Sequence, residues 1–319
     1  MTMKRVLVTG ASGFVGYHLV ELLLTQRVEI WGTFSSGRSN NVQSINWLSM
    51  DVTDPLEVDF VIKKIKPDVV FHLAAKSNVA NSWINTNQLN TANINGTLNV
   101  VNSILNHSPD SLLVNIGSSE EYGIPTSLPI NEKHILNPVN PYGISKLSAG
   151  LSVLRFCERF NLKVIHVRPF NHIGPGQSLG FVTSDFAKQI VDIETGNSPN
   201  SIHVGNLSSK RDFTDVRDVV KAYWLLSEYG KVGSVYNVCS GISTSISEIL
   251  EKFILLSRKE IKIIVDPNKY RPIDVPVIFG DNHFLCNDTG WNRQYNLDKT
   301  VEDIMNYWRK KSLGELTWL

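Results

Sequence analysis

A tyrosine and a lysine four residues apart, Tyr142 and Lys146, are the pair in this sequence best suited to acid/base chemistry. On a helix, side chains at this spacing share one face, so a phenol and an ammonium group could act on one substrate oxygen. A phenol has a pKa of about 10, and a neighbouring cation would bring this pKa toward neutrality. With 9 Tyr and 31 Lys+Arg in the chain, an ordinary solvated helix face is the alternative interpretation, and the surrounding sequence must decide.

Length and composition limit the kinds of protein that this chain can be. Its 319 residues, 42% of them hydrophobic, suit two domains or one large domain with an appended lobe. A formal net charge of +1 without runs of like charge gives no indication of nucleic-acid binding, and no apolar run approaches a signal peptide or membrane span. Three scattered cysteines predict buried free thiols and no metal site. We therefore expect a cytoplasmic protein with a small-molecule partner.

The start of the chain is predicted to bind a dinucleotide. A β-rich run at residues 6–9 leads into a GxxGxxG turn, after which residues 17–24 have helical apolar spacing. Three glycines let the backbone approach a pyrophosphate, whose charge is met by amides at the helix N-terminus. A turn with close helix packing is the alternative, but the strand before and the helix after favour cofactor contacts. These would come from Gly10, Ser12, Gly13, Phe14, Val15 and Gly16.

The loop after the second predicted strand, residues 28–34, determines which adenosine ribose is accepted. An acidic side chain there would bind a free 2′-hydroxyl, but the loop reads Ser35-Ser36-Gly37-Arg38. Hydroxyl and guanidinium groups suit a 2′-phosphate, so Ser35 and Arg38 favour NADPH, with some use of NADH. A polar loop with an unrelated arginine is the alternative. Asp51 and Val52, after a third predicted strand at 45–50, could hold the adenine edge.

Strands alternate with helices through the first half of the chain. The predicted elements are a helix at 55–65, a buried strand at 69–75, a helix at 87–105 and strands at 112–116 and 164–168. This rhythm predicts an α/β fold, a Rossmann doubly wound parallel sheet, with a smaller α/β substrate-binding lobe at the C-terminal side. We expect residues 1–170 to form the NAD(P)-binding domain, with later strands returning from 210–240, and residues 171–319 to form mainly the substrate lobe.

The carboxyl ends of parallel strands line the ligand crevice of such a sheet. Leu73, Ala74 and Ala75 end the central strand and are predicted to contact the cofactor, and Lys76 and Ser77 follow at the same edge. Ser118 ends the next strand, where its hydroxyl could polarise a carbonyl next to Tyr142. A turn serine that bonds its own backbone is the alternative.

Eight short motifs in register resemble the extended short-chain dehydrogenase/reductases that act on nucleotide sugars. Each motif alone is weak, but together they cover essentially the whole chain. They are Thr9 to Gly16, Leu73-Ala74-Ala75, Asn93 with Gly96-Thr97, Ser118 with Tyr122-Gly123, Tyr142 to Lys146, Arg168-Pro169-Phe170-Asn171, Arg211-Asp212-Phe213 and Arg271-Pro272. Within the family, residues 118–123, 170–177 and 211–218 are most similar to reductases of GDP-linked 4-keto-6-deoxy sugars.

The resemblance implies reduction of the 4-keto group of GDP-4-dehydro-6-deoxy-D-mannose to GDP-D-rhamnose with NAD(P)H. It implies that Tyr142 protonates the sugar O4, that Lys146 binds the nicotinamide ribose and lowers the tyrosine pKa, and that Ser118 assists. It also implies cofactor contacts from Asn93 and Arg168, and a homodimer formed by the helices at 87–105 and 142–160. Implied substrate contacts are Lys76, Ser77, Ser118, Ser119, Glu120, Asn171, Lys188, Arg211 and Arg271.

Glu120 keeps a second activity open. In related 4,6-dehydratases a glutamate at this position removes the C5 proton, so a dehydratase or a 4-epimerase is the alternative to a reductase. Ser119 does not discriminate, because GDP-mannose dehydratases resemble this chain in having serine there. Residues 173–180 lack the arginine-rich segment of those dehydratases, which favours the reductase. A non-catalytic NADP-binding regulator is less favoured, because Ser118, Tyr142 and Lys146 are all retained.

Overall fold

A computed structural model of the protein describes residues 3–35, 45–77, 79–269 and 275–315. Its strands are β1 (Lys4–Thr9), β2 (Val28–Phe34), β3 (Asn46–Ser49), β4 (Val69–His72), β5 (Leu112–Ile116), β6 (Lys163–Pro169), β7 (Asn171–Ile173), β8 (Ser201–Val204), β9 (Lys210–Asp215), β10 (Val235–Val238), β11 (Ser243–Ser245), β12 (Lys262–Val265) and β13 (Val277–Ile278). Its α-helices are α1 (Phe14–Leu23), α2 (Pro55–Ile65), α3 (Thr86–Asn90), α4 (Gly96–His107), α5 (Pro141–Phe160), α6 (Val182–Glu194), α7 (Val216–Tyr229), α8 (Ile246–Leu255), α9 (His283–Thr289) and α10 (Leu297–Ser312).

Seven parallel strands form the central sheet, in the order β10-β6-β5-β4-β1-β2-β3. Strand order reverses on either side of β1, as in a doubly wound sheet whose strands are joined by crossover helices. All four residues of β4 are buried, because helices cover both faces of the sheet. The predicted α/β Rossmann fold is confirmed.

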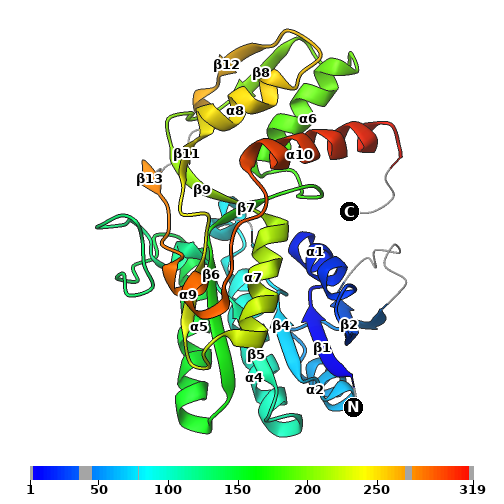
Figure 1. Cartoon of the computed structure of the whole chain (residues 1–319), viewed down its shortest axis with the longest axis vertical. Helices are drawn as coiled ribbons and strands as arrows, with labels where there is room; N and C mark the ends of the chain where they lie inside the picture. Colours follow the sequence, from blue (N-terminus) through cyan, green and yellow to red (C-terminus); the bar gives the residue numbers. More distant parts are fainter. Residues whose placement is uncertain (1–2, 36–44, 78, 270–274, 316–319) are drawn as a thin grey trace.

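Helices cover both faces of this sheet (Figure 1), and an apolar layer lies between the helices and the sheet on each face. On one face α2, α4 and α5 pack together over residues that include Val58, Ile104 and Val153. On the other face α1 packs against α7, and α9 joins α7 beside β10. The ligand-binding edge of the sheet is therefore held by helices on both sides.

A smaller lobe lies beyond the carboxyl edge of the central sheet, at the top of Figure 1. Helices α6, α8 and α10 pack on one another around residues that include Phe186, Phe253 and Ile304. They cover the parallel pair β8–β12 and a second small sheet in which β9 pairs with β7, β11 and β13. In the sequence, α7 and β10 come between the lobe strands β9 and β11, and with them the chain returns to the central sheet.

Two predicted elements differ from the structure because of contacts near the site. The predicted strand at 69–75 ends at His72, since the following backbone leaves the sheet: Ala74 N–H donates to Thr9 Oγ1 (3.2 Å) and Lys76 N–H to Asn93 Oδ1 (2.8 Å). The predicted helix at 87–105 is interrupted by a π-helical segment, Thr91–Asn95. The wider turn accompanies the burial of Asn93 against Lys76.

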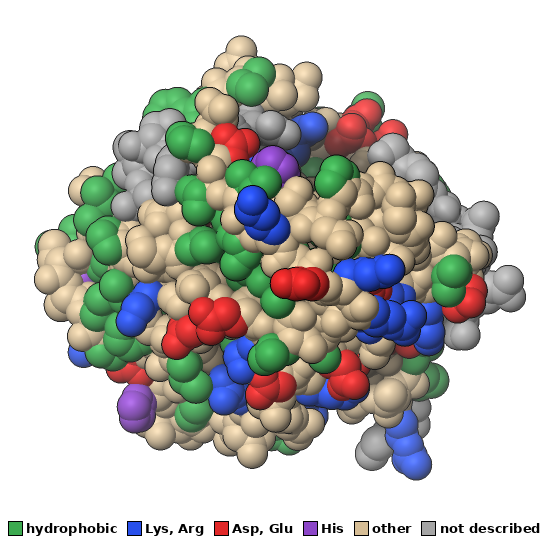
Figure 2. Space-filling model, turned by 90° about the horizontal axis from the view of Figure 1, so that it is seen from above, with side chains coloured by type: hydrophobic (Ala, Val, Ile, Leu, Met, Phe, Trp, Pro, Cys, Tyr) green, Lys and Arg blue, Asp and Glu red, His purple; other side chains and the backbone are tan. Residues whose placement is uncertain are grey.

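The surface charges, the helices and the cysteines can be compared with the predictions made from composition. Figure 2 shows acidic and basic side chains intermixed on the face at the lobe end, as the balanced net charge leads one to expect. Within the described parts of the chain, none of the helices combines the length and apolarity that a bilayer span needs. Cys157, Cys239 and Cys286 are free, as predicted, but only Cys239 is fully buried; the other two are partly exposed.

Candidate active site

A cavity of about 1450 Å³ lies between the carboxyl edge of the central sheet and the smaller lobe. It exceeds the roughly 300–1,000 Å³ of a site for one drug-sized ligand, so a dinucleotide and a second molecule could share it. Its walls come from the glycine-rich turn, the ends of β4, β5 and β6, the start of α5 and the lobe. Most of the sequence-predicted site residues lie on these walls.

The glycine-rich turn forms one end of the cavity. Gly10 has φ +67°, and a Cβ there would lie 2.9 Å from the Ala74 backbone; a Cβ on Gly16 would lie 2.4 Å from Gly10 O. The turn therefore needs glycine at both positions to fold this tightly against β4. Gly13 is the N-cap residue of α1 and has no side chain to cap it. The first amides of the helix are therefore left for a bound anion. All six predicted residues of this turn line the cavity, and their arrangement fits a pyrophosphate.

The predicted adenosine end lies next to the turn. Ser35, Asp51 and Val52 line the cavity, as do Leu73, Ala74 and Ala75 at the end of β4. The Asp51 carboxylate accepts from the Thr53 backbone N–H and hydroxyl, both at 2.9 Å, which fixes its position. Arg38 lies outside the described residues.

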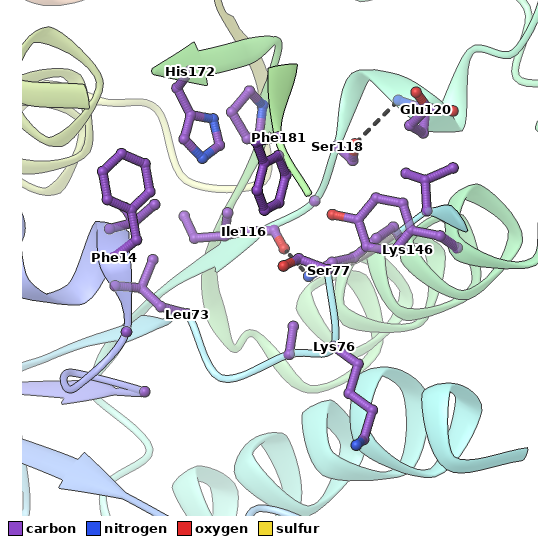
Figure 3. Close-up of a pocket in the computed structure, with 18 of the residues that line it drawn as sticks. Phe14, Leu73, Lys76, Ser77, Ile116, Ser118, Glu120, Lys146, His172 and Phe181 are labelled. Carbon is purple, nitrogen blue, oxygen red and sulfur yellow. Dashed lines mark hydrogen bonds between the residues drawn. The ribbon is translucent and has the colours of Figure 1, made fainter. Parts of the chain in front are cut away.

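The opposite end of the cavity holds the predicted catalytic side chains. Asn140 caps α5 by accepting from Gly143 N–H at 2.8 Å, so that Tyr142 stands in the first turn of the helix and Lys146 one turn later. Lys146 Nζ donates to Ile116 O at 2.8 Å (Figure 3). The Tyr142 phenol is hydrogen-bonded to the Ser118 hydroxyl at the end of β5. The structure thus brings all three predicted groups together.

Predicted substrate residues surround this end. Ser119 and Glu120 line the cavity beside Ser118, and Glu120 Oε2 accepts from Asn140 Nδ2 at 2.7 Å. Asn171 and Arg211 line it from the lobe side, where the Arg211 guanidinium donates to Val275 O at 2.7 Å.

Two further predicted residues, Lys76 and Ser77, also line the cavity, although Figure 3 shows Lys76 pointing away from Ser118 and Lys146. Arg271 lies outside the described residues.

Three predicted site residues lie elsewhere. Asn93 is buried, and its amide bonds the Lys76 backbone and the Ser145 hydroxyl, so it supports the wall behind the cavity. Arg168, near the end of β6, is buried and pairs with a buried carboxylate: its Nε donates to Glu121 at 2.7 Å. Lys188 forms a helical ion pair with Asp192 at 2.6 Å, outside the cavity walls.

Comparison with known proteins identifies the family of this chain. A family model described as GDP-mannose 4,6 dehydratase matches residues 7–304. The chain belongs to this family. It is 32% identical to the GDP-6-deoxy-D-mannose reductase of Pseudomonas aeruginosa, over 97% of this chain and 98% of that one. It is 30% identical to the GDP-6-deoxy-D-talose 4-dehydrogenase of Aggregatibacter actinomycetemcomitans, over 98% and 99% of the two chains.

Solved structures agree with the family assignment. RMD from Pseudomonas aeruginosa, complexed with NADPH, superposes with a TM-score of 0.84 at 31% identity, over 97% of this chain and 99% of that one. A UDP-glucose 4-epimerase of Thermotoga maritima gives a TM-score of 0.89 at 24% identity, over 97% and 99%, which shows the shared fold. The resemblance inferred from the eight sequence motifs is confirmed.

Burial has the largest effect on the two titratable groups at the catalytic end of this family member. Burial raises the pKa of Tyr142 above its ordinary value, and the Ser118 hydrogen bond opposes this only in part. Loss of solvent around the phenol is the largest effect on this pKa, and its lowering by Lys146 stays a prediction. Burial also lowers the pKa of Lys146 to about 8. At neutral pH the tyrosine holds its proton and the lysine is mostly charged.

A buried carboxylate beneath Ser118 was missed by sequence reasoning. Glu121 accepts from Ser118 N–H at 3.0 Å, lies 3.1 Å from His166 Nε2 and pairs with Arg168. Among these contacts, His166 contributes most to holding the pKa of Glu121 at about 2, despite the opposing effect of burial. The spacing of Ser118 and Glu121 is that of a capping box, which was the available signal.

Aromatic residues on the lobe side of the cavity were also not predicted as site residues. His172 stacks on Phe14 with ring centroids 6.2 Å apart, and Phe181 lies beside them (Figure 3). Burial lowers the pKa of His172, so its ring is neutral. The stack connects β7 to the glycine-rich turn across the cavity. Sequence reasoning could not find it, because Phe14 and His172 belong to segments that only the fold brings together.

Proposed function

We propose that this chain reduces the C4 carbonyl of GDP-4-dehydro-6-deoxy-D-mannose with NADPH, giving GDP-D-rhamnose. The observation that carries the proposal is the convergence of Ser118, Tyr142 and Lys146 at one end of a cavity whose other end is an uncapped helix N-terminus. The Pseudomonas aeruginosa relative named GDP-6-deoxy-D-mannose reductase supports the sugar and the reaction. Other relatives, named as a GDP-6-deoxy-D-talose 4-dehydrogenase and a GDP-mannose 4,6 dehydratase, support an oxidoreductase or dehydratase that acts on a GDP-sugar.

The chemistry of the proposal follows from the protonation of the site. A carbonyl carbon that accepts hydride leaves an alkoxide, and this oxygen must receive a proton. Tyr142 retains its proton at neutral pH because its pKa is raised, and it stands where it can donate. The Ser118 hydroxyl can donate to the same oxygen and so stabilise the developing charge. Lys146, one helical turn away, favours the phenolate left behind.

The bound cofactor would supply the hydride, and the residues of the glycine-rich turn would hold its pyrophosphate. We propose NADPH because Ser35 lines the cavity and the Pseudomonas aeruginosa relative was solved with it. Replacing Arg38 with alanine should raise the Michaelis constant for NADPH more than that for NADH. Equal effects on the two constants would remove this assignment.

A dehydratase is the second candidate, and Glu120 is the observation that favours it. Its carboxylate lies on the cavity wall, held by Asn140, where a base for the sugar C5 proton would stand. The family model that matches the chain is also described by that activity. Against it, residues 173–180 contain no arginine that could take the place of the missing arginine-rich segment.

We also propose a homodimer formed through α4 and α5. The exposed side of α5 carries apolar side chains at helical spacing, with Ile144 49% exposed and Leu151 45% exposed, and Phe160 at the end of the helix 54% exposed. Light scattering should give the mass of two chains at micromolar concentration. A monomer mass at that concentration would contradict the dimer.

Product identity tests the proposed reaction directly. The purified protein should be incubated with NADPH and the 4-keto-6-deoxy product of a GDP-mannose 4,6-dehydratase, and the sugar nucleotide examined by proton NMR. We expect a GDP-6-deoxyhexose with the rhamno configuration at C4. The talo configuration would contradict the proposed stereochemistry, and an unchanged 4-keto sugar would contradict reduction.

A further inference from the structure

Tyr223 is a second phenol at this cavity, and the chemistry above does not use it. It lies in α7, is fully buried and lines the same cavity as Tyr142. Its hydroxyl has no hydrogen-bond partner among the described residues. Buried hydroxyl groups nearly always have a partner, so an unpaired one on a cavity wall indicates a ligand atom that pairs with it.

The packing of α7 places the Tyr223 ring in the core beside the cavity. The residue belongs to the apolar layer formed with Val114, Ile165 and Val167, where α7 packs against β5 and β6. Long side chains on a helix point toward its N-terminus. The N-terminus of α7 directly follows β9 at the cavity end of the sheet. The ring is therefore held in the core, and the general preference of helical side chains directs its hydroxyl toward the cavity end of the sheet.

The charge state of Tyr223 makes it a hydrogen-bond donor. Burial raises its pKa, and the nearby Tyr142 phenol raises it further, so the hydroxyl stays protonated. Tyr142 and Tyr223 line the same cavity. The partner of Tyr223 is therefore an acceptor bound in the cavity that holds the proposed reacting atoms.

Among the molecules that the proposed function requires, the nicotinamide ring is the apolar group that must lie beside Tyr142. Its carboxamide oxygen is a neutral acceptor. The sugar, in contrast, is expected on the side of Glu120 and Ser119, which polar side chains already line. We infer that the Tyr223 hydroxyl donates a hydrogen bond to the carboxamide oxygen of the cofactor's nicotinamide ring and so fixes which face of the ring is turned to the substrate. This inference rests on the proposed function.

The variant Tyr223→Phe removes the hydroxyl and keeps the ring. We expect the NADPH dissociation constant, measured by calorimetry, to rise roughly 2- to 10-fold, as for loss of one neutral hydrogen bond. Binding of 2′-phospho-ADP-ribose, which lacks nicotinamide, should be unchanged. The thermal midpoint of the ligand-free protein should stay the same or rise, because the removed hydroxyl has no partner among the residues that the structure describes.

Tyr236 offers a matched control in the same core. It is also fully buried, but its hydroxyl donates to Asp288 Oδ2 at 2.6 Å and accepts from Lys231 N–H at 2.9 Å. It does not line the cavity. Tyr236→Phe should therefore show the opposite pattern, with a lower thermal midpoint and unchanged binding of both ligands.

Three outcomes would overturn the inference. They are an unchanged NADPH dissociation constant for Tyr223→Phe, equal weakening of NADPH and 2′-phospho-ADP-ribose, or a thermal midpoint that falls as it does for Tyr236→Phe. These measurements need no sugar substrate. If Tyr223→Phe weakens NADPH binding as expected but the wild-type protein does not reduce the sugar, only the proposed function is contradicted. If the wild-type protein reduces the sugar but Tyr223→Phe binds NADPH as tightly as wild type, only the role of Tyr223 is contradicted.

Discussion

Two groups of buried polar residues lie at the ends of β5 and β6, and they differ in how their hydrogen bonds are satisfied. The salt-bridge cluster, Glu121, His166 and Arg168, pairs its members with one another at 2.7–3.1 Å. In the phenol cluster, Tyr142, Lys146 and Tyr223, Lys146 donates to a backbone carbonyl and Tyr223 has no partner among the described residues. The first cluster is completed by the protein itself, whereas the second has polar groups left for ligands.

The difference teaches which buried polar groups position the site and which act in it. Glu121 binds the Ser118 backbone, so the salt-bridge cluster holds the serine at the place where the phenol cluster needs it. Fully paired polar networks make a core rigid, whereas unpaired groups cost stability unless a ligand satisfies them. Changes in the salt-bridge cluster should therefore lower stability, whereas changes in the phenol cluster should lower turnover.

Tyr142→Phe should have the largest effect and should act on turnover alone. General acid catalysis typically contributes ~10²- to 10⁴-fold, and the NADPH oxidation rate with the 4-keto sugar should fall by that factor. The thermal midpoint should change little, because the ring remains in place. A variant that unfolds at much lower temperature, or that keeps most of its turnover, would break the comparison between the clusters.

Glu121→Gln should act mainly on stability. It leaves His166 and Arg168 buried beside a neutral group, so the free energy of unfolding from urea titration should fall by about 3–5 kcal/mol. Because the pKa of Glu121 is lowered from 4.5 to about 2, its contribution is complete above pH 4.5 and is lost as the pH falls through about 2. The difference between wild type and variant should shrink over that range.

Glu248 is the control for Glu121, since it completes an exposed capping box with Ser245 at the start of α8. Glu248→Gln should cost about 1 kcal/mol or less. Equal losses at the two glutamates would mean that Glu121 acts only as a helix cap and not as the centre of a buried cluster.

The pH dependence of turnover sharpens the description of the phenol cluster. Lys146 supports the phenolate only while it is charged, and burial lowers its pKa to about 8. The value of kcat/KM should therefore be steady below pH 8 and fall above it, approaching tenfold per pH unit. Lys146→Arg, which keeps the charge at all these pH values, should remove this alkaline decline from whatever activity remains. An alkaline decline that persists in the arginine variant would contradict the assignment.

Glu120→Gln should have the smallest effect, because reduction of a preformed ketone needs no base at C5. We expect the NADPH oxidation rate to fall less than ~10-fold, below the range typical of a lost acid or base. The Asn140 contact can be kept by the amide oxygen of glutamine. A loss as large as that of Tyr142→Phe would instead indicate proton removal by Glu120.

Much of the fold could be predicted because its signals are local. The strands at 28–34 and 112–116 and the helix at 55–65 have the predicted bounds. The glycine-rich turn and the spacing of Tyr142 and Lys146 likewise depend on neighbours in the sequence.

What could not be predicted depends on contacts between distant segments. Arg168 was expected to contact the cofactor, but it pairs with Glu121, 47 residues away. The Tyr142 pKa depends on burial by several elements, and Tyr223 reaches the cavity only because α7 packs on the sheet.

The absorbance of NADPH, followed with each of two sugar nucleotides, tests the central claim most directly. The purified protein should be mixed with NADPH and either GDP-4-dehydro-6-deoxy-D-mannose or GDP-mannose, and the sugars analysed at the end. Our account predicts loss of NADPH absorbance with the 4-keto sugar only, and no conversion of GDP-mannose. Conversion of GDP-mannose without net loss of NADPH, and no oxidation with the 4-keto sugar, would contradict it.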